Sequence, residues 1–408
     1  MTSFDSSPHQ LNVWRALLAL AVVFVMLATT GWTAVRQHKA VTSPVQAALS
    51  AWEHGRVDGH ALPAPDSSPA RLSHFFASLT APQRERLAER YPLAVGNMNG
   101  APLSLRYRAN HVALEHAREV AHKRMFDKRL SDVGHADAKK RMQRFAHLAA
   151  GGREILAFDP MGGGRVAEVF GDIRTADRIS IVVPGVGTNL LTFERTSRPY
   201  SAPVGMARAL YAAERAESPG TRTAVIAWAD YTAPDGLGVD AATAMRADEG
   251  AVRLNALLHG GLPGRAPVEL FCHSYGTVLC GVAAHRLPAR VTDIAVAGSP
   301  GMRTRNAAGL GTHARVWATR DKDDWIQDVP YLEVGGLGHG ADPVSSAFGS
   351  RVFAAGDAKG HAGYFTPGTE SLANFADIGT GSYRSVRCAD SHPDCRNGFS
   401  GESPSRRA

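Results

Sequence analysis

The sequence predicts an α/β fold, a mostly parallel sheet flanked by helices, in a chain long enough to enclose a large core. From residue 151 onward, short and mostly apolar runs alternate with segments of helical pattern. Such alternation is typical of parallel strands, which are buried on both faces. Two further observations agree: the first two runs flank a glycine-rich turn, and a later run ends at a serine that opens a helical segment.

The region before residue 151 predicts a helical extension. We expect a helix over 41–53, a linker rich in Gly, Pro and Ser over 55–70, and a largely helical, charged stretch over 103–148. Thr80 and Gln83 form a capping-box pattern with Pro82 in the first turn, which predicts a helix start at Thr80.

The elements of the α/β region follow in order. Residues 155–158 and 165–170, on either side of the glycine-rich turn, predict a hairpin. Apolar strands are then expected at 179–183, 224–229, 268–271, 294–297 and 316–318, with helices at 204–215, 241–258, 278–286 and 371–378. No internal repeat is apparent.

Residues 16–34 form an apolar run without a charged residue, long enough to cross a bilayer as a helix. Trp14 and Trp32 flank it, as interfacial aromatics do. We expect an uncleaved, single-pass anchor in the cell membrane with the rest of the chain outside the cytoplasm. A cleaved signal peptide and a buried core helix are the alternatives. The chain then divides into a membrane segment (1–40), a helical extension (41–150), an α/β domain (151–385) and a polar tail (386–408).

The charge pattern excludes some partners. The formal net charge is +7, but the basic residues are scattered and no dense Lys/Arg run is interleaved with aromatics, so we expect no nucleic-acid partner. A mild excess of positive charge suits a solvated surface or attraction to an anionic membrane. Gly185 and Gly187 could indicate a phosphate loop, but no third glycine or lysine follows, and we expect no cofactor and no metal.

Four cysteines fall into two pairs. Cys388 and Cys395 close a short loop in the polar tail, which predicts a disulfide in an exported chain. A metal site with His392 is the rival interpretation, although the spacing fits no zinc pattern well. We expect Cys272 and Cys280 to be free and packed, because a bond between them requires the strand end to approach the helix closely.

Ser274 stands where the predicted strand 268–271 gives way to a helix. A strand, a sharp turn with serine at its tip and then a helix is the nucleophile elbow of α/β hydrolases. The local sequence is Cys272-His273-Ser274-Tyr275-Gly276, so cysteine replaces the first glycine of the usual Gly-x-Ser-x-Gly. The chain thus predicts a serine nucleophile within the α/β-hydrolase fold.

A serine hydroxyl needs a base, and the base needs an orienting acid. In this fold the acid and then the histidine follow the serine along the chain. The loop after strand 316–318 offers Asp321, Asp323 and Asp324. His361, between two glycines in a late loop, is the expected base, and His339 is its rival.

The oxyanion intermediate needs two backbone N–H donors. One is expected from Tyr275, the residue after the nucleophile. The other is expected from the glycine-containing loop after strand 179–183, where Val186 or Gly187 would donate.

The chain resembles the α/β-hydrolase family catalogued as domain of unknown function 1023, found mainly in actinobacteria. The resemblance runs from about Leu72 onward. It implies hydrolase chemistry and places the acid at Asp324, in Asp323-Asp324-Trp325-Ile326 where members often have Gly-Asp-Pro-Ile. The blocks that carry it are 76–80, 96–102, 106–110, 184–188, 273–276, 298–301, 339–343 and 360–364.

We therefore expect a serine hydrolase with the triad Ser274, His361 and Asp324, acting on an ester or lipid-like acyl substrate at the cell envelope. Its partners would be that substrate and, through the N-terminal helix, the membrane. An amidase or peptidase with the same triad, and a non-catalytic binding protein on a hydrolase fold, are the alternatives.

Overall fold

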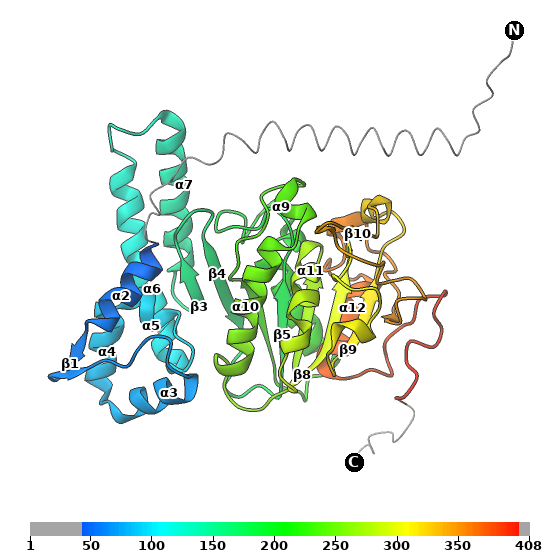
Figure 1. The fold of residues 1–408 in the computed structure, drawn as a ribbon, viewed down its shortest axis with the longest axis horizontal. Coiled ribbons are helices and arrows are strands. Elements are labelled where there is room, and N and C mark those ends of the chain that lie inside the picture. The colour runs from blue at the N-terminus through cyan, green and yellow to red at the C-terminus, as the bar shows by residue number, and fades with distance from the viewer. Residues whose placement is uncertain (1–42, 400–408) are drawn as a thin grey trace, which may run out of the picture. The chain divides into compact units, whose positions relative to one another are not determined.

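A computed structural model describes residues 43–399, and the chain from Pro44 onward forms one compact unit. Figure 1 shows a central sheet with helices packed against it and a further group of helices beside its β3 edge. The predicted membrane segment lies outside the described residues. Within residues 43–399, no helix is both long enough and apolar enough to cross a membrane.

The central sheet has eight strands in the order β12-β9-β8-β7-β5-β6-β4-β3. From β12 to β6 neighbouring strands are parallel, whereas β4 is antiparallel to both β6 and β3. The predicted hairpin feeding a parallel sheet is confirmed. The strands are β3 (Glu154–Asp159), β4 (Arg165–Phe170), β5 (Arg178–Val183), β6 (Thr223–Ala229), β7 (Val268–His273), β8 (Val291–Ala297), β9 (Arg315–Thr319) and β12 (Arg351–Val352).

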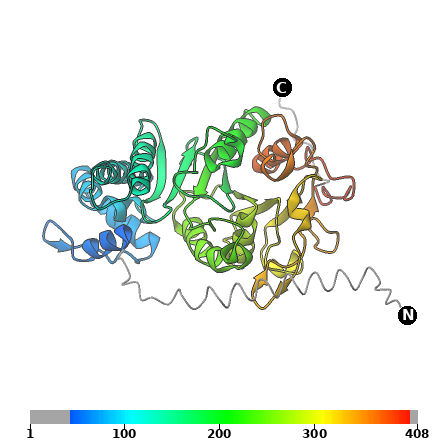
Figure 2. The same ribbon diagram turned by 90° about the horizontal axis from the view of Figure 1, so that it is seen from above.

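Helices cover both faces of the sheet (Figure 2). On one face α10 (Met245–Gly260) packs with α11 (Tyr275–Ala283), and on the other α8 (Pro203–Glu217) packs with α12 (Glu370–Thr380). Successive strand residues point to opposite faces. Ile181 accordingly belongs to the apolar cluster under α10 and α11, and Val182 to the cluster under α8 and α12.

The N-terminal helices form a group with an apolar core of its own around Trp52 and Phe76. The predicted capping box is present: Thr80 accepts a hydrogen bond from the Gln83 backbone, and Gln83 accepts one from the Thr80 backbone. The elements are α2 (Pro44–Glu53), α3 (Pro69–Ser78), α4 (Ala81–Arg90), α5 (Pro92–Gly96), α6 (Leu103–Arg124), α7 (Asp132–Leu148), and the paired β1 (Arg56–Val57) and β2 (His60–Ala61).

Two predicted helices are interrupted. The stretch 103–148 breaks between α6 and α7, because the Ser131 side chain accepts a hydrogen bond from the Gly134 backbone and caps a new helix. The stretch 241–258 divides into α9 (Val239–Ala242) and α10. Shorter elements are η1 (Pro199–Ser201), η2 (Ala284–Arg286), η3 (Ala308–Leu310), η4 (Trp325–Asp328), η5 (Gly360–Ala362), β10 (Glu333–Val334) and β11 (Leu337–Gly338).

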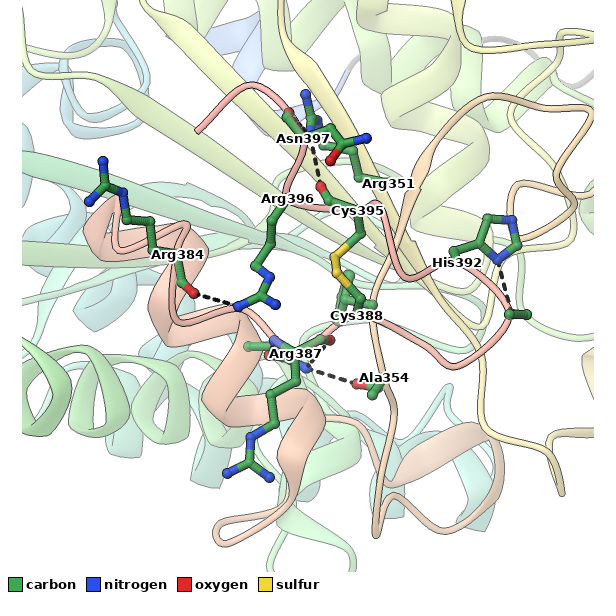
Figure 3. Close-up of a disulfide and its surroundings, with 12 residues drawn as sticks. Arg351, Ala354, Arg384, Arg387, Cys388, His392, Cys395, Arg396 and Asn397 are labelled. Carbon is green, nitrogen blue, oxygen red and sulfur yellow. Dashed lines mark hydrogen bonds between the residues drawn. A yellow bond between two sulfur atoms is a disulfide. The ribbon is translucent and has the colours of Figure 1, made fainter. Parts of the chain in front are cut away.

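The C-terminal tail is held to the sheet edge, as Figure 3 shows. Cys388 and Cys395 form the predicted disulfide. Arg351 on β12 donates to the carbonyl oxygen of Cys395 at 2.7 Å, and the Ala354 backbone donates to that of Arg387 at 2.9 Å. The rival metal interpretation is not supported, because the sulfur atoms are bonded to each other and the His392 ring shares a hydrogen bond with Ser391.

Candidate active site

Ser274 lies in the turn between β7 and α11, with φ 56° and ψ −130°. A side-chain-bearing residue rarely adopts positive φ, and here the surrounding hydrogen bonds hold it there. The Ser274 backbone N–H donates to Ala297 on β8 at 3.0 Å, and its carbonyl accepts from the Thr277 hydroxyl at 2.7 Å. The strand, the strained turn and the helix form the predicted nucleophile elbow.

Two glycines make room for this turn. A Cβ on Gly276 would overlap the carbonyl oxygen of Val183 at the end of β5. A Cβ on Gly185, in the loop after β5, would collide with the Ser274 side chain. The loop after β5 and the elbow therefore approach each other as closely as the backbone allows.

The predicted free thiols at Cys272 and Cys280 are wrong, because the two residues form a disulfide. The helix α11 starts directly after Ser274 and runs back against β7, which brings Cys280 beside the strand end with a Cα–Cα distance of 6.6 Å. The cysteine that replaces the first glycine of the motif thus cross-links the strand to the helix of the elbow.

His361, on η5, lies between the serine and a carboxylate. Its Nε2 is 2.8 Å from Ser274 Oγ, and its Nδ1 is 2.9 Å and 3.0 Å from the two carboxylate oxygens of Asp324. A carboxylate only accepts hydrogen bonds, so Nδ1 carries the proton and Nε2 is free to accept the one from serine. The structure brings the three predicted residues together in one hydrogen-bonded chain.

Asp324 is fully buried and caps η4 by accepting a hydrogen bond from the Ile326 backbone at 2.9 Å. Burial raises its pKa, but hydrogen bonds from His361 and Tyr364 outweigh burial and hold the pKa below its usual value. The neighbouring Asp321 positions the histidine loop, because its Oδ2 accepts a hydrogen bond from the Gly360 backbone at 2.6 Å. Asp323 is exposed.

Two positioning residues were missed by sequence reasoning. Tyr364 donates from its hydroxyl to Asp324 Oδ2 at 2.6 Å, and burial raises the pKa of this phenol so that it stays protonated. His273 donates from Nε2 to the carbonyl oxygen of His361 at 2.7 Å. Burial lowers the pKa of His273 to about 3, which keeps its ring neutral. Both lie within motif blocks, but only tertiary contacts reveal what they hold.

The rival base, His339, does not reach Ser274 through a hydrogen bond. Its Nε2 pairs with the carbonyl oxygen of Ala241 at 2.7 Å, and its ring packs edge-on against Tyr275 with centroids 5.7 Å apart. Burial lowers its pKa. His339 thus connects the loop around α9 to the elbow.

The predicted oxyanion donors differ in their availability. The Gly187 N–H already donates to the Pro234 carbonyl at 2.7 Å. Among the described residues, no acceptor occupies the N–H of Val186 or of Tyr275, and Tyr275 begins α11, where a backbone N–H has no partner within the helix. Of the predicted donors, Val186 and Tyr275 are therefore the two whose backbone N–H groups have no acceptor among the described residues.

A comparison with known protein families agrees with the α/β fold. Residues 159–334 match a family model described as "Alpha/beta hydrolase". The chain is 30% identical over 192 residues to the uncharacterized protein Mb0988c of Mycobacterium bovis, covering 44% of this chain and 71% of the relative. The chain belongs to the α/β-hydrolase family. The narrower family that the motifs indicate stays a prediction.

A longer alignment joins this α/β hydrolase to the uncharacterized protein Rv2079 of Mycobacterium tuberculosis, with 27% identity over 377 residues and 78% of this chain. The chain spans 57% of the length of that relative. Among solved structures, an arylesterase aligns with 65% of this chain and 96% of its own, at 12% identity and a TM-score of 0.32. A 2,6-dihydroxy-pseudo-oxynicotine hydrolase aligns with 84% of this chain and 94% of its own, at 11% identity and a TM-score of 0.34. These values are too low to bear on a substrate.

Proposed function

We propose that this α/β hydrolase is a serine hydrolase that cleaves a carboxylic ester of a lipid-like acyl group at the cell envelope. The observation that supports the proposal most directly is the continuous hydrogen-bonded chain from Ser274 through His361 to the buried Asp324, at a strained elbow. In that arrangement the serine has a base, and the base has an acid that fixes its tautomer.

The reaction runs in two halves. Ser274 Oγ attacks the ester carbonyl carbon while its proton passes to His361 Nε2, and the oxyanion accepts hydrogen bonds from Val186 and Tyr275. The C–O bond to the alcohol then breaks, and His361 returns the proton to the leaving oxygen. A water molecule attacks the acyl-serine by the same route and releases the acid.

The location at the envelope rests on two features. Residues 16–34 are apolar and long enough to anchor the chain in a bilayer. All four cysteines are paired in two disulfides, and disulfides persist in oxidising compartments outside the cytoplasm. Digestion of intact cells with an added protease tests this location: degradation of the unit that begins at Pro44 is expected, and its survival until the cells are lysed would contradict the proposal.

A fluorophosphonate probe tests the chemistry, because it reacts only with an activated serine. We expect stoichiometric labelling of the folded protein at Ser274, none in Ser274→Ala, and strongly reduced labelling in His361→Ala. Absence of labelling in the folded wild-type protein would remove the enzyme interpretation. Matched ester and amide forms of one acyl group then separate an esterase from an amidase, and faster amide cleavage would overturn the ester preference.

A further inference from the structure

Large exposed apolar side chains gather at one end of the α/β domain. Strands β5 to β9 are parallel, so the segments after their carboxyl ends emerge at the same edge of the sheet, where Ser274 also lies. Figure 1 shows α9 and β10 together at this end. The exposed apolar residues at this end of these segments are Leu237, Val239, Met245, Trp325, Leu332 and Val334. Two others, Val120 and Val252, lie partway along α6 and α10.

The same end carries apolar residues from the N-terminal half of the unit. Met161 lies in the β3–β4 turn, and β3 points in the same direction as β6 because β4 is antiparallel to both. Phe126 and Val133 lie at the tip of the α6–α7 hairpin, which Figure 1 shows rising on this side of the sheet. They are 69% and 80% exposed.

The opposite end of the sheet differs. Among the described residues, no large exposed apolar side chain lies in the segments that precede β5 to β9, namely 171–177, 218–222, 261–267, 287–290 and 311–314. Scattered exposed apolar residues are normal on a soluble surface, whereas concentration at one end marks an interaction surface.

This surface is connected to the catalytic residues. Trp325 is 43% exposed, and its ring packs on the ring of His361 with centroids 4.8 Å apart. An apolar phase in contact with this end of the molecule would therefore touch the side chain that covers the catalytic base.

Charge at the hairpin tip favours a particular apolar phase. The segment 122–133 carries four basic residues, Lys123, Arg124, Lys128 and Arg129, against two acidic ones, Asp127 and Asp132. Exposed apolar side chains with a local excess of positive charge suit the interface of an anionic bilayer.

The position of Pro44, near which the described chain begins, is consistent with docking on a bilayer. Pro44 borders a groove of about 510 Å³ together with Val120 on α6 and Met161 in the β3–β4 turn. Nine residues, 35–43, separate it from the apolar run 16–34. Nine extended residues span at most roughly 30 Å. If the run is the membrane anchor, a tether of this length keeps the α/β hydrolase close to the lipid.

We propose that this end of the molecule is a bilayer-docking face, made of Phe126, Val133, Leu237, Val239, Trp325, Leu332 and Val334. The face lies on the outer lipid surface with Ser274 toward it, so that an acyl chain reaches the nucleophile directly from the bilayer. This inference rests on the proposed function for its substrate, but the docking itself is independent of catalysis.

The test uses the full-length protein in vesicles of phosphatidylcholine and phosphatidylglycerol. Because the four native cysteines are bonded, a single introduced cysteine is the one site that a thiol-reactive fluorophore labels. Labels at Phe126→Cys and Leu237→Cys report on the docking face. A label at Ala216→Cys, exposed near the end of α8 at the opposite edge of the sheet, is the matched control.

We expect spin-labelled lipid to quench the fluorophores at positions 126 and 237 but not at 216. Equal quenching at all three positions, or none at 126 and 237, would overturn the docking face. Loss of phosphatidylglycerol should weaken quenching at position 126, next to the basic residues.

A kinetic comparison separates docking from chemistry. The double variant Phe126→Ser/Val133→Ser, far along the hairpin from the triad, should lose several-fold of its turnover on a vesicle-borne ester and none on a short soluble ester. An equal loss on both substrates would contradict the docking face. Failure of the wild-type protein to react with the fluorophosphonate would instead contradict the proposed function, and the quenching pattern would still decide the docking.

Discussion

At the residue scale, hydrogen bonding separates three carboxylates that lie within four positions of one another. Asp324 alone faces His361, while Asp321 accepts from Gly360 and Asp323 is exposed. Spacing along the chain could not make this distinction, whereas the resemblance to known motifs singled out Asp324, the carboxylate that lies against His361 in the structure. Both buried aspartates hold the histidine loop. Asp324 orients the His361 ring, and Asp321 holds the backbone of Gly360.

The first prediction concerns Asp324 as the acid that orients His361. Asp324→Asn removes the negative acceptor that holds the Nδ1 proton, so kcat should fall by about 10³- to 10⁴-fold with little change in KM. The measurement is steady-state hydrolysis of a soluble ester. Asp342→Asn is the control, because Asp342 pairs with Arg320 at 2.7 Å and makes no contact with His361. A larger loss in the control than in Asp324→Asn would place the acid elsewhere.

At the element scale, the sequence predicted the strands well and the breaks between helices less well. A buried strand such as β6 is recognisable from its composition alone, whereas the α6–α7 turn depends on one serine cap within a charged helical stretch. The elbow disulfide was missed for a related reason. Whether Cys280 faces Cys272 depends on the direction in which α11 leaves the turn, and a linear pattern does not contain that direction.

The second prediction concerns the elbow disulfide. The bond joins residues eight positions apart, and for a loop of this size the loss of chain entropy in the unfolded state corresponds to about 2–3 kcal/mol. Cys272→Ala/Cys280→Ala should therefore lower the free energy of unfolding by about that amount and leave kcat on a soluble ester within a factor of about three. Urea unfolding and ester kinetics provide the two readings.

The comparison variant is Cys388→Ala/Cys395→Ala, which removes the tail disulfide away from the triad. It should lower stability without any change in fluorophosphonate labelling. A collapse of labelling in the elbow variant at a temperature where it is still folded would show that the bond positions Ser274 rather than only stabilising the fold.

The third prediction concerns a carboxyl buried between α8, β5 and α12. Glu214 is fully buried and is hydrogen-bonded to the Ser180 hydroxyl, and burial raises its pKa to about 8. Between about pH 4.5, the ordinary pKa of a glutamate, and about pH 8, the Glu214 carboxyl is ionised in the unfolded chain and protonated in the folded protein. The stability that this proton contributes is complete below the lower value and is lost as pH rises through the window, by up to about 1.4 kcal/mol per pH unit.

Glu214→Gln removes this titration. From about pH 5 to about pH 8, the free energy of unfolding of the variant should rise steadily relative to that of the wild-type protein. This slope is expected whatever the difference in stability between the two proteins at pH 5. Urea unfolding at several pH values measures the difference. Glu119→Gln, at an exposed position on α6, is the matched control for the substitution. A flat difference for Glu214→Gln would mean that the carboxyl is ionised in the folded protein.

At the scale of the whole molecule, the helical extension and the sheet are joined by buried polar contacts. Arg106 on α6 is 2% exposed and donates to the carbonyl oxygens of Gly96, Leu156 on β3 and Gly261 after α10. Asn110, one turn later, donates to Gly96 and to Ile155 on β3 at 2.8 Å. The sequence pattern divided the chain at residue 150, but these contacts make α6 part of the packing of the sheet edge.

The last prediction concerns these buried hydrogen bonds between α6 and the sheet edge. Arg106→Met removes a donor from three buried carbonyl groups, those of Gly96, Leu156 and Gly261, of which Gly96 keeps Asn110 as a donor. A buried carbonyl left without a donor costs about 1–3 kcal/mol. The substitution also removes a side chain that reaches α5, β3 and the end of α10 together. The wild-type protein should unfold in one transition. The variant should lose several kcal/mol, with the helical extension opening before the sheet. Hydrogen exchange resolved along the chain measures both regions.

Arg108→Met, two residues away on the exposed face of α6 with ion pairs to Glu85 and Glu89, is the control and should leave the single transition intact. Two transitions in the wild-type protein would show that the extension is an independent folding unit despite its shared contacts.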